Sequence, residues 1–110
     1  AEVRVYATAS GRLYRALRRH EAPVLAVFFC PHNPLQLLSA DGQGTVCVWD
    51  YEDGALLRSA SLPPLAAACP GSCTAEPSLL TASEEDGEAV LHEARLGAGG
   101  AARRRLAALP

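Results

Sequence analysis

The chain has 110 residues, enough for one small domain, and its 12 acidic and 10 basic residues give a net charge of −2. That balance argues against bulk electrostatic attraction to nucleic acid or to a membrane surface. The longest apolar run, Pro23–Cys30, is far shorter than the ~20 residues that span a bilayer, and no basic-then-apolar secretory leader opens the chain. The chain begins at Ala1 and contains no Met, so we expect a segment of a longer protein.

The first 61 residues carry the pattern of six short strands. Alternating apolar residues predict strands over Val3–Tyr6 and Arg12–Leu17. A run rich in Val and Phe, Pro23–Cys30, predicts a strand that is buried on both faces, and the two prolines of the PHNP segment end it. Three further strands follow, and a glycine-containing turn separates the first two of them: Leu35–Ala40, Thr45–Asp50 and Ala55–Ser61.

After residue 62 the strand pattern weakens. Two prolines interrupt it, the segment LAAAC (65–69) is compatible with a short inner strand, and PGSCTAEP is loop sequence. Strands are predicted over Ser78–Ser83 and over EAVLHEARL (88–96), with an acidic turn between them. From Gly97 onward the small-residue run GAGGAARRRLAALP predicts a linker that is disordered or poorly packed.

A repeat with a spacing of 43 residues organises these strands. VRVYATASGRLYR (3–15) aligns with VCVWDYEDGALLR (46–58), so Tyr6 falls on Trp49 and Arg15 falls on Arg58. A weaker third copy, AVLHEARLG (89–97), keeps its acid and its glycine in phase and places His92 on Trp49. A period of about 40–45 residues with a Trp-Asp pair is typical of propeller blades, in which four-stranded sheets bury their apolar faces by stacking on one another.

Five features together resemble a WD-repeat unit: His20, AVFFCP, LLSA, GT and VWD. The resemblance covers about residues 3–96 and is strongest over residues 20–50. It implies an all-β fold, a WD-repeat β-propeller fragment with about two four-stranded antiparallel blades. Residues 1–19 would end one blade, 20–61 would form the best repeat, 62–97 a degenerate repeat, and 98–110 a linker or the start of the next element.

The resemblance also implies a hydrogen-bonded set inside the blade, which we call the blade lock. In WD repeats it joins a strand Ser or Thr, a His before the first strand, a turn Asp and the strand Trp. The matching positions here are Ser39, His20 and Trp49, while Gln43 stands where the turn Asp is expected. A neutral amide accepts a weaker hydrogen bond than a carboxylate. We therefore expect an imperfect lock of His20, Ser39, Gln43, Trp49 and Asp50, in which Asp50 also brackets the turn to the outer strand together with Gly54. Asp41, two residues before Gln43, is not included.

A narrower resemblance suggests a cellular role. The run Asn33–Ser59, with VRVYATASGRLYRAL before it, is similar to an early blade of nucleolar WD-repeat proteins of the small-subunit processome. This implies a non-enzymatic scaffold for ribosome biogenesis, in pre-rRNA processing and RNA polymerase I transcription, located in the nucleus and nucleolus. The implied partners are other protein subunits of a large ribonucleoprotein assembly, without a cofactor, membrane or small-molecule substrate. The alternative is a WD-repeat adaptor of another pathway, such as a ubiquitin-ligase substrate receptor.

Basic runs offer weak candidates for contact with phosphate or RNA. Arg15, Arg18 and Arg19 lie in RALRRH, and a second run, RRR, occupies positions 103–105. Short basic runs are weakly specific, so exposed arginines on an outer strand and a linker are the favoured interpretation, by about three to one.

The cysteines suggest a competing class of function, an enzyme or a metal-dependent module. Cys69 and Cys73 could supply two ligands beside the acidic turn SEEDGE (83–88), but the remaining candidates, Cys30, His32 and His92, do not show the paired spacing of zinc sites. Nothing else suggests secretion, so reduced thiols in a cytosolic or nuclear protein are expected.

Overall fold

The structure is a computed structural model that describes residues 1–73, 75–97 and 100–109, with side chains through residue 107. These residues form ten β-strands and no helix, so the prediction of an all-β chain is confirmed. A search of the described residues accordingly finds no helix able to cross a membrane.

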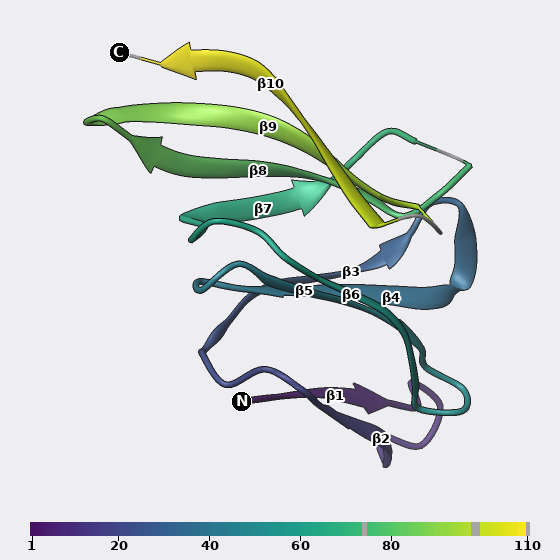
Figure 1. The fold of residues 1–110 in the computed structure, drawn as a ribbon. Helices are drawn as coiled ribbons and strands as arrows, with labels where there is room; N and C mark the ends of the chain where they lie inside the picture. Colours follow the sequence, from purple (N-terminus) through teal and green to yellow (C-terminus); the bar gives the residue numbers. More distant parts are fainter. Residues whose placement is uncertain (74, 98–99, 110) are drawn as a thin grey trace.

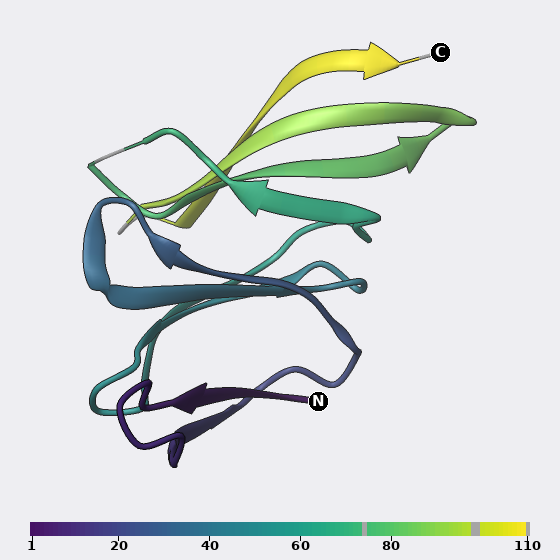
Figure 2. The same cartoon turned by 180° about the vertical axis from the view of Figure 1, so that it is seen from behind.

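The strands form three antiparallel sheets, and within each sheet strands that follow one another in the chain are hydrogen-bonded neighbours. The first sheet contains β1 (Glu2–Tyr6) and β2 (Leu13–Arg18). The second contains β3 (Val24–Cys30), β4 (Asn33–Asp41), β5 (Thr45–Asp50) and β6 (Ala55–Ser61). The third contains β7 (Ala67–Pro70), β8 (Ser78–Glu85), β9 (Glu88–Gly97) and β10 (Gly100–Leu109). The sheets are stacked with the second in the middle, as Figure 1 and the reverse view in Figure 2 show.

A β-bulge recurs at the spacing found in the sequence. It lies opposite Val5/Tyr6 in the first sheet, Val48/Trp49 in the second and Leu91/His92 in the third, so each bulge follows the previous one by 43 residues. In each case the extra residue lies on the last strand of the sheet, which we call the outer strand: Tyr14 on β2, Leu57 on β6 and Leu106 on β10. Bulges bend a strand and redirect its side chains, so the repeat preserves a shape as well as a pattern of apolar residues.

The turn before each outer strand is also repeated in the first two sheets. The Gly11 N–H donates to the Ala7 carbonyl at 2.8 Å, and the Gly54 N–H donates to the Asp50 carbonyl at 2.9 Å. Both glycines have a positive φ, +70° and +73°, which residues with a Cβ rarely adopt. The glycine that the sequence keeps in phase thus closes the same turn twice.

Two apolar cores lie on opposite faces of the second sheet. One core, against the first sheet, consists of Val3, Leu17, Leu37, Cys47 and Trp49. The other core, against the third sheet, includes Leu38, Val46, Val48, Leu79 and Ala94. Successive residues of β4 and β5 alternate between the two cores, so both strands are buried on each side.

The prediction that the first strand of the second sheet is buried on both faces is wrong. Along β3, Leu25, Val27 and Phe29 are 44%, 45% and 59% exposed, while Phe28 packs against the core shared with the third sheet. Val27 pairs with Ser39 and therefore lies on the face directed toward the first sheet. That sheet has two strands among the described residues, and its core reaches β4, β5 and Val24 at the start of β3 but leaves Leu25, Val27 and Phe29 exposed.

The expectation of a linker after Gly97 is also wrong for residues 100–109. They form β10, which pairs with β9 from Gly100↔Gly97 to Leu109↔Ala89 and completes the third sheet as its fourth strand. The remaining positions of that expectation, 98, 99 and 110, lie outside the described residues. Small residues indicate a chain with high conformational entropy, but β10, a strand of ten residues, is ordered by its hydrogen bonds to β9.

The open face of β3 predicts that the isolated 110-residue chain self-associates or melts without a sharp transition. Leu25, Val27, Phe29 and Leu35 expose apolar area there, and such patches drive association. The double substitution Leu25→Thr/Val27→Thr should raise the monomer fraction in analytical ultracentrifugation, whereas Leu38→Thr in the buried core should unfold the chain. A cooperative melt from a soluble unmodified monomer would contradict this prediction.

Candidate functional site

Four side chains form a continuous buried hydrogen-bond chain in the second sheet. His20 enters from the β2–β3 loop, Ser39 and Asp41 come from β4, and Trp49 comes from β5. His20 Nδ1 lies 2.8 Å from Asp41 Oδ2, and its Nε2 lies 2.6 Å from Ser39 Oγ. Trp49 Nε1 donates to Ser39 Oγ at 2.9 Å. The loop, the second strand and the third strand of this sheet are thereby joined through side chains.

Asp41 takes the place that the sequence analysis gave to Gln43. The Gln43 side chain is exposed, and only its backbone N–H takes part, donating to Asp41 Oδ1 at 2.9 Å. The Thr45 N–H donates to the same oxygen at 3.1 Å. One carboxylate therefore closes the β4–β5 turn with Oδ1 and binds His20 with Oδ2. A signal for this was present, because residues 39 and 41 are two apart in a strand and so share a face.

The ionised form of Asp41 is stabilised although the side chain is fully buried. Burial alone would raise the pKa of Asp41, but hydrogen bonds from His20 and from the backbone N–H groups of Thr45 and Gln43 outweigh it and hold the pKa below its ordinary value. These bonds to a charged acceptor are stronger than bonds between neutral groups. The carboxylate is therefore a firm anchor for the turn and the loop.

The order Ser39–His20–Asp41 matches that of a hydrolase triad, a partner set that the sequence analysis did not find for His20. The carboxylate accepts from Nδ1–H, and in the neutral imidazole Nε2 accepts the Ser39 hydroxyl proton. However, Ser39 is fully buried and its oxygen already accepts from Trp49. A nucleophile must reach a substrate carbonyl, which this oxygen cannot do in its present position. The geometry fits a structural role.

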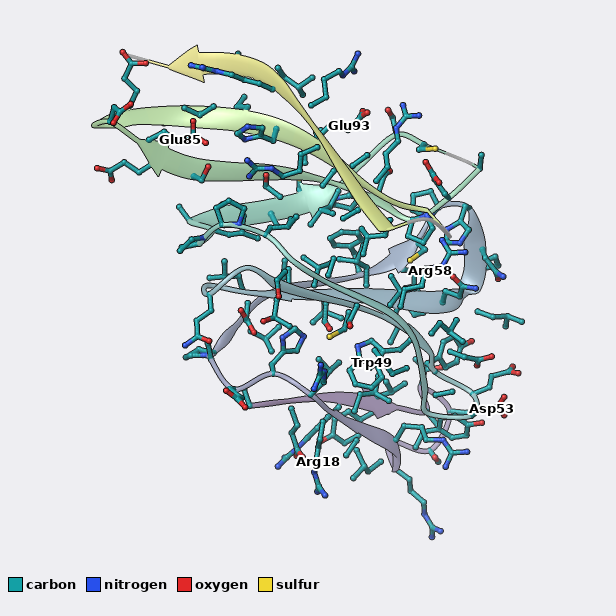
Figure 3. All side chains as sticks on the ribbon, in the orientation of Figure 1. Arg18, Trp49, Asp53, Arg58, Glu85 and Glu93 are labelled. Atoms are coloured by element: carbon teal, nitrogen blue, oxygen red, sulfur yellow. The ribbon has the colours of Figure 1, made fainter. Side chains whose placement is uncertain are left out.

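Trp49 and Asp50 lie next to each other but differ in role. The Trp49 ring, labelled in Figure 3 between the first and second sheets, is buried in the core that they share. Asp50 lies outside the buried chain, and its Oδ1 accepts from the N–H groups of Glu52 and Asp53 at 3.0 and 3.4 Å. Asp50 thus closes the β5–β6 turn as an Asx turn, together with the positive φ of Gly54.

The third sheet contains an altered copy of the same site. Relative to the β-bulge, His92 on β9 occupies the same position as Trp49 on β5. Its Nε2 lies 3.9 Å from Glu85 Oε1. Thr81 and Ser83 are buried beside it on β8, and among the described residues their hydroxyl oxygens have no hydrogen-bond partner. The imidazole here comes from the third strand of the sheet instead of the preceding loop. The label "degenerate" for this repeat thus corresponds to a rearranged polar set.

The three arginines suggested for phosphate contact do not form one cluster. Arg15 donates through Nε and Nη2 to the Glu52 carbonyl at 2.9 and 2.7 Å. Arg18 pairs with Glu2 at 2.7 Å, on the opposite face of the first sheet, and Arg19 is exposed in the following loop. The second basic run lies on β10, and Arg104 there approaches Glu93 at 3.7 Å.

The cysteines are free thiols of two kinds. Cys30 and Cys47 are buried, and burial raises the pKa of each to about 11. Cys69 is exposed and Cys73 is partly exposed. Within the described ranges, no three His, Cys, Asp or Glu side chains lie close enough together to hold a metal ion.

The blade lock predicts a graded series of stability losses. Trp49→Ala should lower the free energy of unfolding by roughly 3–5 kcal/mol as a buried aromatic truncation, and Ser39→Ala by about 1–3 kcal/mol because it leaves two buried partners unsatisfied. Gln43→Ala, the matched control on the exposed turn, should change it by less than about 0.5 kcal/mol. Urea denaturation of the longest natural chain that contains these blades measures all three. A loss for Gln43→Ala equal to that for Ser39→Ala would show that the lock is misassigned.

The lowered pKa of Asp41 also predicts how the free energy of unfolding falls at acidic pH, which we call the acid limb. Because its folded pKa lies below the ordinary ~3.9, its contribution is complete above about pH 4 and is lost as the pH falls through the folded value. Asp41→Asn should lower stability at pH 7 by about 1–3 kcal/mol and flatten its decline below about pH 4.

Glu2 provides the control for this pH experiment. Hydrogen bonds from Arg18 and Arg4 lower the pKa of its partly exposed carboxyl to about 2, so Glu2 also titrates below about pH 4. Salt screens exposed pairs far more than buried ones, so 0.5 M NaCl should suppress the effect of Glu2→Gln but preserve that of Asp41→Asn. An unchanged acid limb in Asp41→Asn would contradict the assignment.

Comparison with known proteins finds WD-repeat relatives over about half of the chain. The chain is 36% identical over 62 residues to WD repeat-containing protein 75 of Mus musculus, which covers 56% of this chain and 8% of the relative. It is 37% identical over 57 residues to the proteins of that name from Danio rerio and Homo sapiens, which covers 52% of this chain and 7% of each relative. No family model matches the chain. The matched region is similar to WD repeats, and the two four-stranded antiparallel sheets have the architecture of propeller blades. The chain spans less than a tenth of the length of these relatives.

Proposed function

We propose that this chain is part of a non-enzymatic WD-repeat scaffold that docks other proteins. The observation that carries the proposal is the burial of the Ser39–His20–Asp41 set, whose polar atoms are directed at one another and at Trp49. Groups arranged in this way hold a blade together and leave binding to the exposed turns and outer strands, where functional residues of rigid scaffolds usually lie.

We further propose that the scaffold acts in ribosome biogenesis. The support is the similarity to WD repeat-containing protein 75 over about half of the chain, together with the narrower resemblance of residues 33–59 to nucleolar processome proteins. The role would be in pre-rRNA processing and RNA polymerase I transcription, in the nucleus and nucleolus. The partners would be other protein subunits of a ribonucleoprotein assembly. Contact with RNA would be weak or indirect, since Arg15 is bound to the Glu52 carbonyl and Arg18 is paired with Glu2.

Localisation and depletion of the longest natural chain that contains these blades test the proposal. We expect a nucleolar signal and altered levels of 18S rRNA precursors after depletion, restored by the unmodified chain and by Gln43→Ala but not by Trp49→Ala. Diffuse nuclear or cytosolic signal with co-purifying cullin subunits would instead support an adaptor of a ubiquitin ligase. Normal 18S rRNA precursors after complete depletion would overturn the ribosomal role.

A further inference from the structure

Arg15 connects the first sheet to the second. It lies on β2, and its Nε and Nη2 both donate to the Glu52 carbonyl, in the turn between β5 and β6 of the next sheet. The Tyr14 hydroxyl donates to the same oxygen at 3.4 Å. The acceptor is a main-chain atom in a turn, where carbonyl groups lack a partner in the ladder.

Arg58 makes the same kind of connection between the second and third sheets. It lies on β6, 43 residues after Arg15, and its Nη1 donates to the Leu96 carbonyl on β9. The contact is partly buried, and Figure 3 labels Arg58 between these two sheets. In both cases the donor is on the outer strand of one sheet and the acceptor is near the end of the third strand of the next sheet.

The recurrent bulge explains why this position can reach the neighbouring sheet. Tyr14 is the extra residue in the first sheet and Leu57 in the second, and each is followed at once by the arginine. A bulge redirects the side chains that follow it. Arg15 and Arg58 pair with Val5 and Val48 respectively, so they occupy the same register in the two sheets.

Arginine is suited to this contact by its shape. Its planar guanidinium presents Nε–H and Nη–H groups side by side, so two donors can bind one carbonyl oxygen, whereas a lysine ammonium is a single flexible point charge. Gly54 leaves room for the first contact, because a Cβ there would lie 3.3 Å from Arg15 Cδ. That distance is tight enough to displace the side chain.

We propose that Arg15 and Arg58 form an inter-blade clamp, a bulge-plus-arginine element that recognises a main-chain carbonyl at the end of the third strand of the following blade. Because the acceptor belongs to the backbone, the contact itself does not fix the side chain there, which is Glu at position 52 and Leu at position 96. The third sheet keeps the bulge, but Ala107 occupies the arginine position, so this sheet carries no clamp donor at that place.

The proposal is tested by hydrogen exchange with a reciprocal design. The amides beside the two acceptors are themselves hydrogen-bonded, Gly54 N–H to Asp50 and Leu96 N–H to Pro77, so they report local opening. Arg58→Ala should speed exchange of residues 94–97 about threefold to tenfold and leave residues 52–54 unchanged, and Arg15→Ala should do the reverse. Each should also lower the Tm by no more than roughly 2–4 °C, as expected from the loss of one charged hydrogen-bond site in a domain larger than about 150 residues.

Two further variants complete the design in the longest natural chain that contains these blades. Arg12→Ala is the matched control, because within the described part of the chain its side chain makes no hydrogen bond or ion pair. Arg15→Lys keeps the charge and should recover less than half of the protection lost in Arg15→Ala if the guanidinium geometry matters. Equal exchange at both sites in both alanine variants, an effect of Arg12→Ala as large as that of Arg58→Ala, or full rescue by lysine would overturn the clamp.

Discussion

The carboxylate of Asp41 is the interaction on which the best-formed blade depends. It is fully buried, and it receives hydrogen bonds from an imidazole and two backbone N–H groups. A buried charge without such donors would cost several kcal/mol, so the turn, the loop and the strand must all be in place together. His20 extends this requirement to Ser39 and Trp49, and Trp49 carries it into the apolar core against the first sheet. One hydrogen-bonded set of side chains therefore stabilises both the β4–β5 turn and the packing of the second sheet on the first.

Stacking is the second constraint, and it decides which apolar residues are buried. β4 and β5 have a neighbouring sheet on each side, and their side chains fill two cores. β3 is equally apolar, and its Val24 packs against the core shared with the first sheet, but Leu25, Val27 and Phe29 beyond it remain exposed. Burial in a repeat protein is a property of neighbours, since each unit contributes an interface and not a closed core.

Features that depend on residue spacing could be predicted from the sequence. The side chain that reaches His20 and the pairing of the last strand could not. The 43-residue period, the positions of Trp49, Ser39 and His20 and nearly all strands could be read from alternation and turn residues. The WD-repeat pattern predicts Gln43 as the partner of His20, whereas strand alternation places residues 39 and 41 on one face and so favours Asp41, which the structure shows. β10 was missed because small residues and arginines carry little strand propensity, and its order comes from pairing with β9.

Polar contacts within a blade and polar contacts between blades depend on the sequence to different degrees. Within a blade, the lock uses four side chains that bind one another, and in the third sheet the buried imidazole is instead that of His92 on β9. Between blades, the arginine contacts address main-chain carbonyls, and any residue can present a carbonyl. The bulge persists in all three sheets while the lock residues change. Backbone shape is thus the most constant feature of the repeat, because it positions both the side chains that are retained and those that are replaced.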